Sequence, residues 1–466
     1  MRNFLFAFVF LFFTCSCTQS IDNSQQALPE RPNIIFIMTD DHAKNAMSIY
    51  GSDLINTPNL DRIGKEGIVF NRSYVTNSIC GPSRAVFLTG KYSHVNGFRD
   101  NSDHFDGSQM TYPKILQENG YYTAVVGKWH LKSVPEGFDY WNVLIGQGDY
   151  YNPTMVDMGD TLDHTGYTTS VITDFAIETL DQRIPKDQPF CLMVHHKAPH
   201  RNWMPDSVHL TLGEQVYPIP DSFYDPYTDR PAAAEQDQAI SRMFMSSDMK
   251  LDPARLDKET GTGGAQDNSN ILAGWQRLYD RLAPDQKQYW DQYYMPISDQ
   301  FFSTNLEGQE LVEWKYQRYM NDYLKCIMSV DDNVGRLLNH LEESDQLDNT
   351  WIIYTSDQGF YLGEHGWYDK RFMYEESFGM PLVMRYPAII KPGSTNQNLV
   401  LNLDFAPTVM DLLGIETNEP WQGNSLLPLM KGEAKEIHPD GIYYHSYEYP
   451  HGWHKVKRHY GVSTSR

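Results

Sequence analysis

The fold is decided by the stretch Asn33-Ile34-Ile35-Phe36-Ile37-Met38-Thr39-Asp40-Asp41-His42. Its continuous apolar run over residues 33–38 is typical of a strand that is buried on both faces of a mostly parallel sheet. The run leads into two carboxylates, Asp40 and Asp41. Because ligand sites in such sheets lie beyond the carboxyl ends of the strands, these two acids stand where a binding site is expected.

Strand-like and helical patterns alternate through the rest of the chain. The predicted strands cover residues 33–38, 68–74, 121–126, 190–194, 349–354 and 381–384. The predicted helices cover residues 58–66, a segment from 113, 168–182, 313–343 and 404–413. This alternation predicts an α/β fold with a large, mostly parallel central sheet and helices on both faces. Residues 201–310 break the rhythm and predict an insertion that caps the sheet.

Length and charge limit the classes of function. A chain of 466 residues is long enough for a large core and for more than one domain. Its formal net charge of −22 opposes association with nucleic acid, whose phosphates the field of the protein would repel. We therefore expect no nucleic-acid partner.

The N-terminus predicts export. Met1-Arg2-Asn3 precedes an apolar run over residues 4–13, which is too short to cross a bilayer and is typical of a signal peptide. Thr14-Cys15-Ser16-Cys17 then resembles the cleavage box of bacterial lipoproteins. Cys17 is favoured over Cys15 as the lipidated residue because Ser16 precedes it, and an ordinary cleaved signal peptide is the alternative.

These features divide the N-terminal segment in two. Residues 1–17 are predicted to be the signal peptide with its lipobox, and residues 18–30 a polar tether. The protein would then be periplasmic or at the cell surface, in contact with a membrane only through a lipid anchor at Cys17, or otherwise secreted.

A cysteine stands at a predicted helix start in Ser78-Ile79-Cys80-Gly81-Pro82-Ser83-Arg84-Ala85-Val86-Phe87-Leu88-Thr89-Gly90-Lys91. Pro82 suits the first helical turn and Gly90 suits the helix end. Cys80 would therefore lie beside free backbone N–H groups and near Arg84, which makes an anion site. An isolated cysteine in such a position is more often an inert thiol.

The segment Cys80-Gly81-Pro82-Ser83-Arg84, continued by Leu88-Thr89-Gly90-Lys91, resembles the signature of the type I sulfatases, which share the alkaline phosphatase-like superfold. The resemblance implies that a formylglycine-generating enzyme oxidises Cys80 to formylglycine. The hydrated aldehyde would then attack the sulfur of a sulfate ester. The net negative charge of the chain implies that local cations hold this sulfate in one pocket.

Two acidic pairs follow two predicted strands. Asp40-Asp41 and Asp357-Gln358 together offer hard oxygen donors, which suit Ca²⁺ and, less well, Mg²⁺. An isolated Asp-Asp pair is more often part of a turn or a helix cap, and a second pair after a buried-type strand weakens that interpretation. The sulfatase resemblance implies that all four residues bind calcium together with the modified Cys80.

The resemblance also implies a set of catalytic side chains: Arg84, Lys128, His130, His200 and Lys370. Arg84 would hold the diol, and His130 would take the proton whose removal expels sulfate. Because His130 lies two residues after Lys128, both side chains would point to the same side of an extended segment. His200 and Lys370 would bind the sulfate and donate a proton to the departing alcohol.

Two further stretches resemble the branch that contains the N-acetylglucosamine-6-sulfatases. They are Asp369-Lys370-Arg371-Phe372-Met373-Tyr374-Glu375-Glu376-Ser377 and Trp314-Lys315-Tyr316-Gln317-Arg318-Tyr319-Met320. The implied substrate is a sulfated carbohydrate with a 6-O-sulfate on N-acetylglucosamine. The candidates for contacts to its ring hydroxyls are Asp369, Arg371, His454 and His459, with Trp453 as a possible stacking face.

The resemblance divides the chain into a catalytic sulfatase domain over residues 31–415, with its capping insertion at 201–310, and a C-terminal subdomain over 416–466. The subdomain is expected to be α+β with an antiparallel sheet, and to be cut short, because relatives usually continue through another strand. Two alternative functions stay open: a phosphonate or phosphate monoester hydrolase of the same superfold, and a non-catalytic glycan-binding lipoprotein that keeps Cys80 as a thiol.

Overall fold

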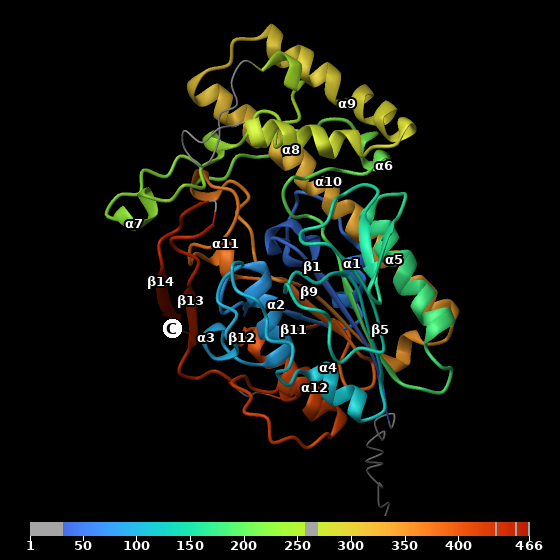
Figure 1. Cartoon of the computed structure of the whole chain (residues 1–466). Helices are drawn as coiled ribbons and strands as arrows, with labels where there is room; N and C mark the ends of the chain where they lie inside the picture. The colour runs from blue at the N-terminus through green and yellow to red at the C-terminus, as the bar shows by residue number, and fades with distance from the viewer. Residues whose placement is uncertain (1–30, 257–268, 434–435, 453, 465–466) are drawn as a thin grey trace, which may run out of the picture.

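The computed structural model describes residues 31–256, 269–433, 436–452 and 454–464 (Figure 1). The predicted signal peptide, the tether with Cys17, and Trp453 lie outside the described residues. No helix in the described part of the chain combines the length and the apolar character that a membrane span requires.

The elements are well defined along the chain. The strands are β1 (Asn33–Thr39), β2 (Ile68–Phe70), β3 (Ser73–Tyr74), β4 (Tyr122–Lys128), β5 (Tyr140–Leu144), β6 (Thr154–Asp157), β7 (Asp160–Asp163), β8 (Phe190–His195), β9 (Thr350–Ser356), β10 (Leu382–Arg385), β11 (Ser394–Asn396), β12 (Val400–Leu401), β13 (Ile442–Ser446) and β14 (His459–Ser463). The α-helices are α1 (Pro58–Lys65), α2 (Cys80–Thr89), α3 (Ser93–Asn96), α4 (Tyr112–Glu118), α5 (Thr168–Glu178), α6 (Ser207–Leu210), α7 (Pro231–Ala234), α8 (Ser269–Asp280), α9 (Pro284–Ser303), α10 (Gly308–Glu343), α11 (Glu375–Phe378), α12 (Phe405–Leu413) and α13 (Leu427–Met430).

A large central sheet organises the described residues. Its ten strands have the order β11-β2-β10-β9-β1-β8-β4-β5-β6-β7 in the part of the chain that the structure covers. The five strands from β9 to β5 run parallel, whereas β10 at one side and β6 and β7 at the other pair antiparallel with their neighbours. The predicted α/β fold with a mostly parallel sheet is confirmed.

Strand β1 lies between β8 and β9 and separates two hydrophobic cores. Ile35 and Ile37 pack into the core under α1, α5 and α10, whereas Ile34 and Phe36 pack into the core under α2, α4 and α12. Figure 1 shows these two groups of helices on opposite sides of the sheet. Since both faces are buried, every position of β1 from Ile34 to Met38 has to be apolar.

The C-terminal hairpin packs against the core under α2, α4 and α12, to which it contributes Ile442 and Tyr444. Strands β13 and β14 pair antiparallel, as a small two-stranded sheet of their own. The backbone N–H of His445 donates to the carbonyl of Thr76 over 3.0 Å, and the Tyr444 hydroxyl donates to the carbonyl of Arg371 over 2.5 Å. The hairpin therefore supports the segment that carries Lys370 and Arg371.

Some element boundaries differ from the sequence-based predictions. The single strand expected over 68–74 is split into β2 and β3, because β2 pairs with β10 and β11 whereas β3 pairs with β12. Strands β5, β6 and β7 were not predicted, and residues 313–343 form part of one long helix, α10. Within the insertion, α8 and α9 lie beyond one end of the sheet (Figure 1).

A contact between distant segments caps helix α1. The carboxylate of Asp331, on α10, accepts hydrogen bonds from the backbone N–H groups of Asn59 at 3.0 Å and Leu60 at 2.8 Å. These two groups belong to the first turn of α1, and the residue before the helix, Thr57, supplies no side-chain cap of its own. Asp331 therefore satisfies backbone donors that helix geometry leaves unpaired.

Replacing Asp331 by alanine is expected to lower the free energy of unfolding by about 1–3 kcal/mol, because the variant leaves buried donors without acceptors. Urea-induced unfolding followed by circular dichroism measures this change. Glu343→Ala, at an exposed position on the same helix, is the matched control and should change stability by less than about 0.5 kcal/mol. Equal unfolding midpoints for the two variants would contradict the capping role.

Candidate active site

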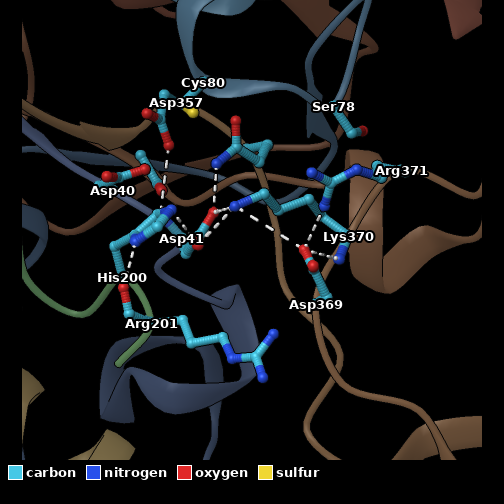
Figure 2. A network of polar contacts seen from close by, with 12 residues as sticks. Asp40, Asp41, Ser78, Cys80, His200, Arg201, Asp357, Asp369, Lys370 and Arg371 are labelled. Atoms are coloured by element: carbon cyan, nitrogen blue, oxygen red, sulfur yellow. Dashed lines mark hydrogen bonds and ion pairs between the residues drawn. The ribbon is translucent and has the colours of Figure 1, made fainter. Parts of the chain in front are cut away.

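Four adjacent parallel strands deliver the predicted site residues to one edge of the sheet. Asp40 and Asp41 follow β1, Lys128 is the last residue of β4, and Asp357 follows β9. His200 comes five residues after the end of β8. The strands β4, β8, β1 and β9 are consecutive in the sheet, so their carboxyl ends meet, as Figure 2 shows for several of these side chains.

Three buried carboxylates form the floor of the site. One oxygen each from Asp40, Asp41 and Asp357 lies within 4.8 Å of the others, and all three residues are fully buried. Burial raises the pKa of Asp41 to about 6; Lys370 lowers it in part and Asp357 raises it further. Carboxylates so close together in a buried place repel one another, so nearby positive charge is needed to stabilise the cluster.

Cationic side chains surround this cluster. Lys128 forms an ion pair with Asp40, and the Lys370 ammonium lies 2.6 Å from each carboxylate oxygen of Asp41. Arg84 donates from Nε to Asp357 over 2.9 Å and from a terminal nitrogen to the carbonyl of Lys128 over 2.8 Å. Asp41 and Asp369 hold the pKa of Lys370 above its usual value even though burial acts to lower it.

The donor set fits a hard divalent cation. Oδ1 of Asp40 and Oε1 of Gln358 are buried and accept no hydrogen bond from the described residues. Both are hard oxygen donors, the kind that Ca²⁺ and Mg²⁺ prefer. The side chain of Gln358 lies against Asp41, to which its amide nitrogen donates over 2.5 Å. The four residues of the two acidic pairs therefore converge on one place, as the sequence predicted.

Cys80 is the first residue of α2 and is 1% exposed. The side chain of Asn101 donates to Sγ over 3.6 Å and accepts from the backbone N–H of Gly81 over 3.3 Å. Sγ also lies within 4.8 Å of ligand atoms of Asp40 and His200. Burial raises the pKa of the thiol, and Asp357 and Asp41 raise it further while Lys370 opposes them. The unmodified thiol is therefore a poor nucleophile in this position.

The predicted geometry of His130 was wrong. The peptide leaves strand β4 after Lys128, and His130 adopts a left-handed backbone with φ of 58°. The two side chains are thus not placed by strand alternation. Burial, with the charges of Lys128 and Arg84, lowers the pKa of His130 well below its usual value, and its Nδ1 has no partner among the described residues. His130 is a neutral imidazole with a free nitrogen.

The imidazole of His200 is held by the backbone of the next residue. Its Nδ1 donates to the carbonyl of Arg201 over 2.5 Å, and its Nε2 lies 3.8 Å from a carboxylate oxygen of Asp41. Arg201 in turn pairs with the buried Asp248 through two hydrogen bonds of 2.8 and 2.5 Å. This pairing fixes the loop on which the imidazole stands.

A cavity of about 740 Å³ opens above the cluster. Three of the four predicted sugar-binding residues line it: Asp369, Arg371 and His454. Arg371 donates to Asp369 over 2.7 Å and forms an ion pair with Glu448, while Nε2 of His454 contacts the Asp369 carboxylate. Glu448 lines the cavity too and was not predicted, because no motif surrounds it.

His459 is placed elsewhere, so its prediction as a sugar contact needs correction. It is not part of the cavity lining. Its Nε2 accepts from the backbone N–H of Met373 over 3.0 Å, its Nδ1 donates to the carbonyl of Lys457 over 2.8 Å, and its ring packs on Phe372. Nε2 thus holds β14 against the loop that follows Arg371, and Nδ1 ties the ring to the segment before β14.

Sequence reasoning also missed side chains that carry no recognisable motif. Gln147, on a glycine-containing loop, accepts from Lys128 over 2.5 Å and lines the cavity. Asn101 contacts Cys80, and Lys197 is a buried cavity-lining cation. One feature of the sequence could have identified Lys197 as a site residue: it lies between the predicted buried strand at 190–194 and His200.

Comparisons with known proteins agree with this geometry. A family model described as Sulfatase matches residues 32–415. The chain is 49% identical to N-acetylglucosamine-6-O-sulfatase of Bacteroides thetaiotaomicron, covering 96% of this chain and 79% of that protein. It is 28% identical to human N-acetylglucosamine-6-sulfatase, covering 87% of this chain and 65% of that protein.

A solved structure gives the same result in three dimensions. The structure of BT4656 in complex with its substrate D-glucosamine-2-N,6-O-disulfate matches with a TM-score of 0.87 and 49% identity. The match covers 93% of this chain and 87% of that chain. The fold described above is therefore shared over nearly its whole extent with a chain that binds a sulfated glucosamine.

Proposed function

The chain belongs to the sulfatase family of sulfuric ester hydrolases, and we propose that it removes the 6-O-sulfate from N-acetylglucosamine at a chain end or on the free sugar. The observation that carries this proposal is the joint placement of Cys80 and its charged neighbours beneath a cavity lined by Asp369, Arg371 and His454. The relative at 49% identity, which is named for this activity, supports the choice of sugar.

The proposal includes calcium, with Mg²⁺ the less suitable ion, and formylglycine at position 80. Asp40, Asp41, Asp357 and Gln358 would hold the ion together with the modified residue 80. A calcium ion held by these residues would withdraw electron density from the sulfate and orient it. Formylglycine supplies, as its hydrate, a hydroxyl nucleophile that the protonated thiol of Cys80 cannot replace. A formylglycine-generating enzyme is thus a required partner.

The remaining side chains position charge and move protons. Arg84, Lys128 and Lys370 place positive charge where negative charge develops on the reacting oxygens. His130, held neutral by its surroundings, accepts a proton through its free nitrogen. His200 and Lys370 stand beside Asp41 at the cavity floor, where one of them delivers a proton to the departing alcohol oxygen.

The polar side chains around Asp369 would recognise the sugar. The carboxylate of Asp369 is fixed by Arg371 and His454, so it presents a defined acceptor to a ring hydroxyl. Arg371 is itself held by Glu448. We further propose that the protein is exported and anchored through a lipid at Cys17, which places the site where extracellular glycans can reach it.

A comparison of two esters of one alcohol tests the proposed reaction. We expect kcat/KM for N-acetylglucosamine 6-sulfate to exceed that for the 6-phosphate by at least about 100-fold. A phosphate monoester carries close to two negative charges at neutral pH, which the buried carboxylates oppose more strongly than the single charge of a sulfate ester. A preference for the phosphate ester would instead support a phosphate monoester hydrolase of the same superfold.

A further inference from the structure

Lys197 is a buried cation at the site to which none of the roles above has been assigned. It lies two residues after the end of β8 and three before His200. The residue is 4% exposed, and its side chain lines the cavity together with His200 and Tyr150. A lysine so deeply buried is unusual unless it has a partner.

The ammonium of Lys197 forms no ion pair with a carboxylate among the described residues. In contrast, Arg84, Lys128, Lys370 and Arg371 each form at least one such ion pair. The contact that holds Lys197 is the face of Tyr150, whose ring centroid lies 4.8 Å from Nζ. Tyr150 is fixed in turn because its hydroxyl donates to the carbonyl of His200 over 2.7 Å.

Several titrating groups of the site respond to the charge of Lys197. Burial lowers the pKa values of His130, His200 and Lys128, and the charge of Lys197 lowers them further. Burial lowers the pKa of Lys197 itself to about 8, while Asp149 and Asp41 act to raise it. The ammonium therefore lies within electrostatic reach of the reacting centre.

An unpaired ammonium in such a place reduces the stability of the folded protein. A buried cation that faces a cavity and has hydrogen-bond donors to spare is suited to an anionic ligand. The aromatic ring on one side directs Nζ without neutralising its charge. Among the parts of the implied substrate, the sulfate is the anionic group, and it has to lie near Cys80.

We propose that Lys197 binds the sulfate group of the substrate and so distinguishes sulfated from unsulfated sugars. This inference rests on the proposed function. Lys197 would join the cations that the sulfatase resemblance assigns. Those cations are paired with carboxylates, whereas Lys197 forms no ion pair among the described residues that an incoming anion would have to displace.

The inference is tested by ligand binding to the Cys80→Ala protein in buffer with Ca²⁺, because that background neither turns over substrate nor depends on formylglycine. Calorimetry would measure the dissociation constants of N-acetylglucosamine 6-sulfate and of inorganic sulfate. Adding Lys197→Met should raise both constants by about tenfold to 100-fold, the effect of losing one charge-assisted hydrogen bond. Lys197→Arg, which keeps the charge, should recover most of the affinity.

Two control variants distinguish binding of the sulfate group from binding of the sugar ring, and a direct contact from the overall electrostatic field of the cavity. Arg371→Ala should weaken binding of the sulfated sugar and leave binding of inorganic sulfate unchanged. Lys132→Met removes a positive charge at the exposed rim of the same cavity and should change both constants by less than about twofold. A loss with Lys132→Met as large as with Lys197→Met would overturn the inference.

Thermal unfolding gives a second readout. Without ligand, Lys197→Met should raise the melting temperature, because it removes a buried unpaired charge and keeps an apolar stem against Tyr150. A lower melting temperature would assign Lys197 a structural role and overturn the inference. Unchanged dissociation constants would overturn the inference alone, whereas no binding of the sulfated sugar by the Cys80→Ala protein would overturn the proposed function as well.

Discussion

The Cys80→Ala protein is expected to fold normally and to lose turnover of N-acetylglucosamine 6-sulfate by about 10⁴-fold or more. The physical reason is that alanine cannot be oxidised to formylglycine, so no hydroxyl nucleophile forms at position 80, while the charges that bind sulfate stay in place. Cys80 is 1% exposed, but removing one sulfur atom leaves only a small cavity at the helix start. Single-turnover assays measure the chemical step, and circular dichroism measures the fold.

Cys191→Ala is the matched control for this experiment. Cys191 is equally buried, in β8, and its thiol lies in the apolar core away from the charged cluster. Its replacement should lower stability modestly and leave kcat within about twofold. Full activity of the Cys80→Ala protein would contradict the proposed mechanism. Mass spectrometry of the tryptic peptide covering residues 73–84, from protein made in its own host, should show an aldehyde; an intact thiol would favour the non-catalytic glycan-binding alternative.

Removal of divalent cations is expected to reduce activity by more than about 100-fold, with Ca²⁺ restoring it better than Mg²⁺. The expectation follows from the three carboxylates of Asp40, Asp41 and Asp357, which lie within 4.8 Å of one another in a buried place. Lys128, Lys370 and Arg84 each pair with one of these carboxylates, but Oδ1 of Asp40 and Oε1 of Gln358 accept no hydrogen bond from the described residues and are available to an ion. The ion also adds stability: about 2.7 kcal/mol when its concentration is 100 times its dissociation constant. Activity and melting temperature should therefore rise together in a calcium titration.

Asp357→Asn makes the same test without a chelator. The variant should require a higher calcium concentration for half-maximal stabilisation, because an amide is a weaker ligand than a carboxylate and because Arg84 loses its charged partner. Asp348→Asn is the matched control, since Asp348 is 82% exposed and lies outside the site. Undiminished activity after exhaustive chelation, with no change in melting temperature, would contradict a metal centre at this position.

Much of this arrangement was predictable because local sequence and local structure coincide. The run from Ile34 to Met38 is apolar at every position, since a central parallel strand is buried on both faces. The acidic pairs follow β1 and β9 directly, and parallel strands bring their ends together whatever the intervening chain does. Cys80 stands at the start of α2, and Gly90 ends it with φ of 58°. For these features no distant residue had to be known.

Other features depend on contacts between segments far apart in the chain. Glu448 reaches the site because a C-terminal segment packs beside Arg371, and no local pattern marks it. His454 and His459 look alike in sequence, yet one faces Asp369 in the cavity and the other holds a backbone N–H of Met373. The division of the strand at 68–74 follows from which partners β2 and β3 find.

The sequence by itself determined the class of fold, the helix start at Cys80 and the two acidic pairs, because each follows from the period and the order of neighbouring residues. Only the tertiary structure decided the left-handed backbone at His130, the contact of the Lys197 ammonium with the Tyr150 ring and the partners of Asp369. Gly127 shows the reason. A Cβ there would lie 2.0 Å from the carbonyl oxygen of His195 on the neighbouring strand β8, so the residue before Lys128 has to be glycine. Such packing constraints act between residues distant in sequence, and no local pattern contains them.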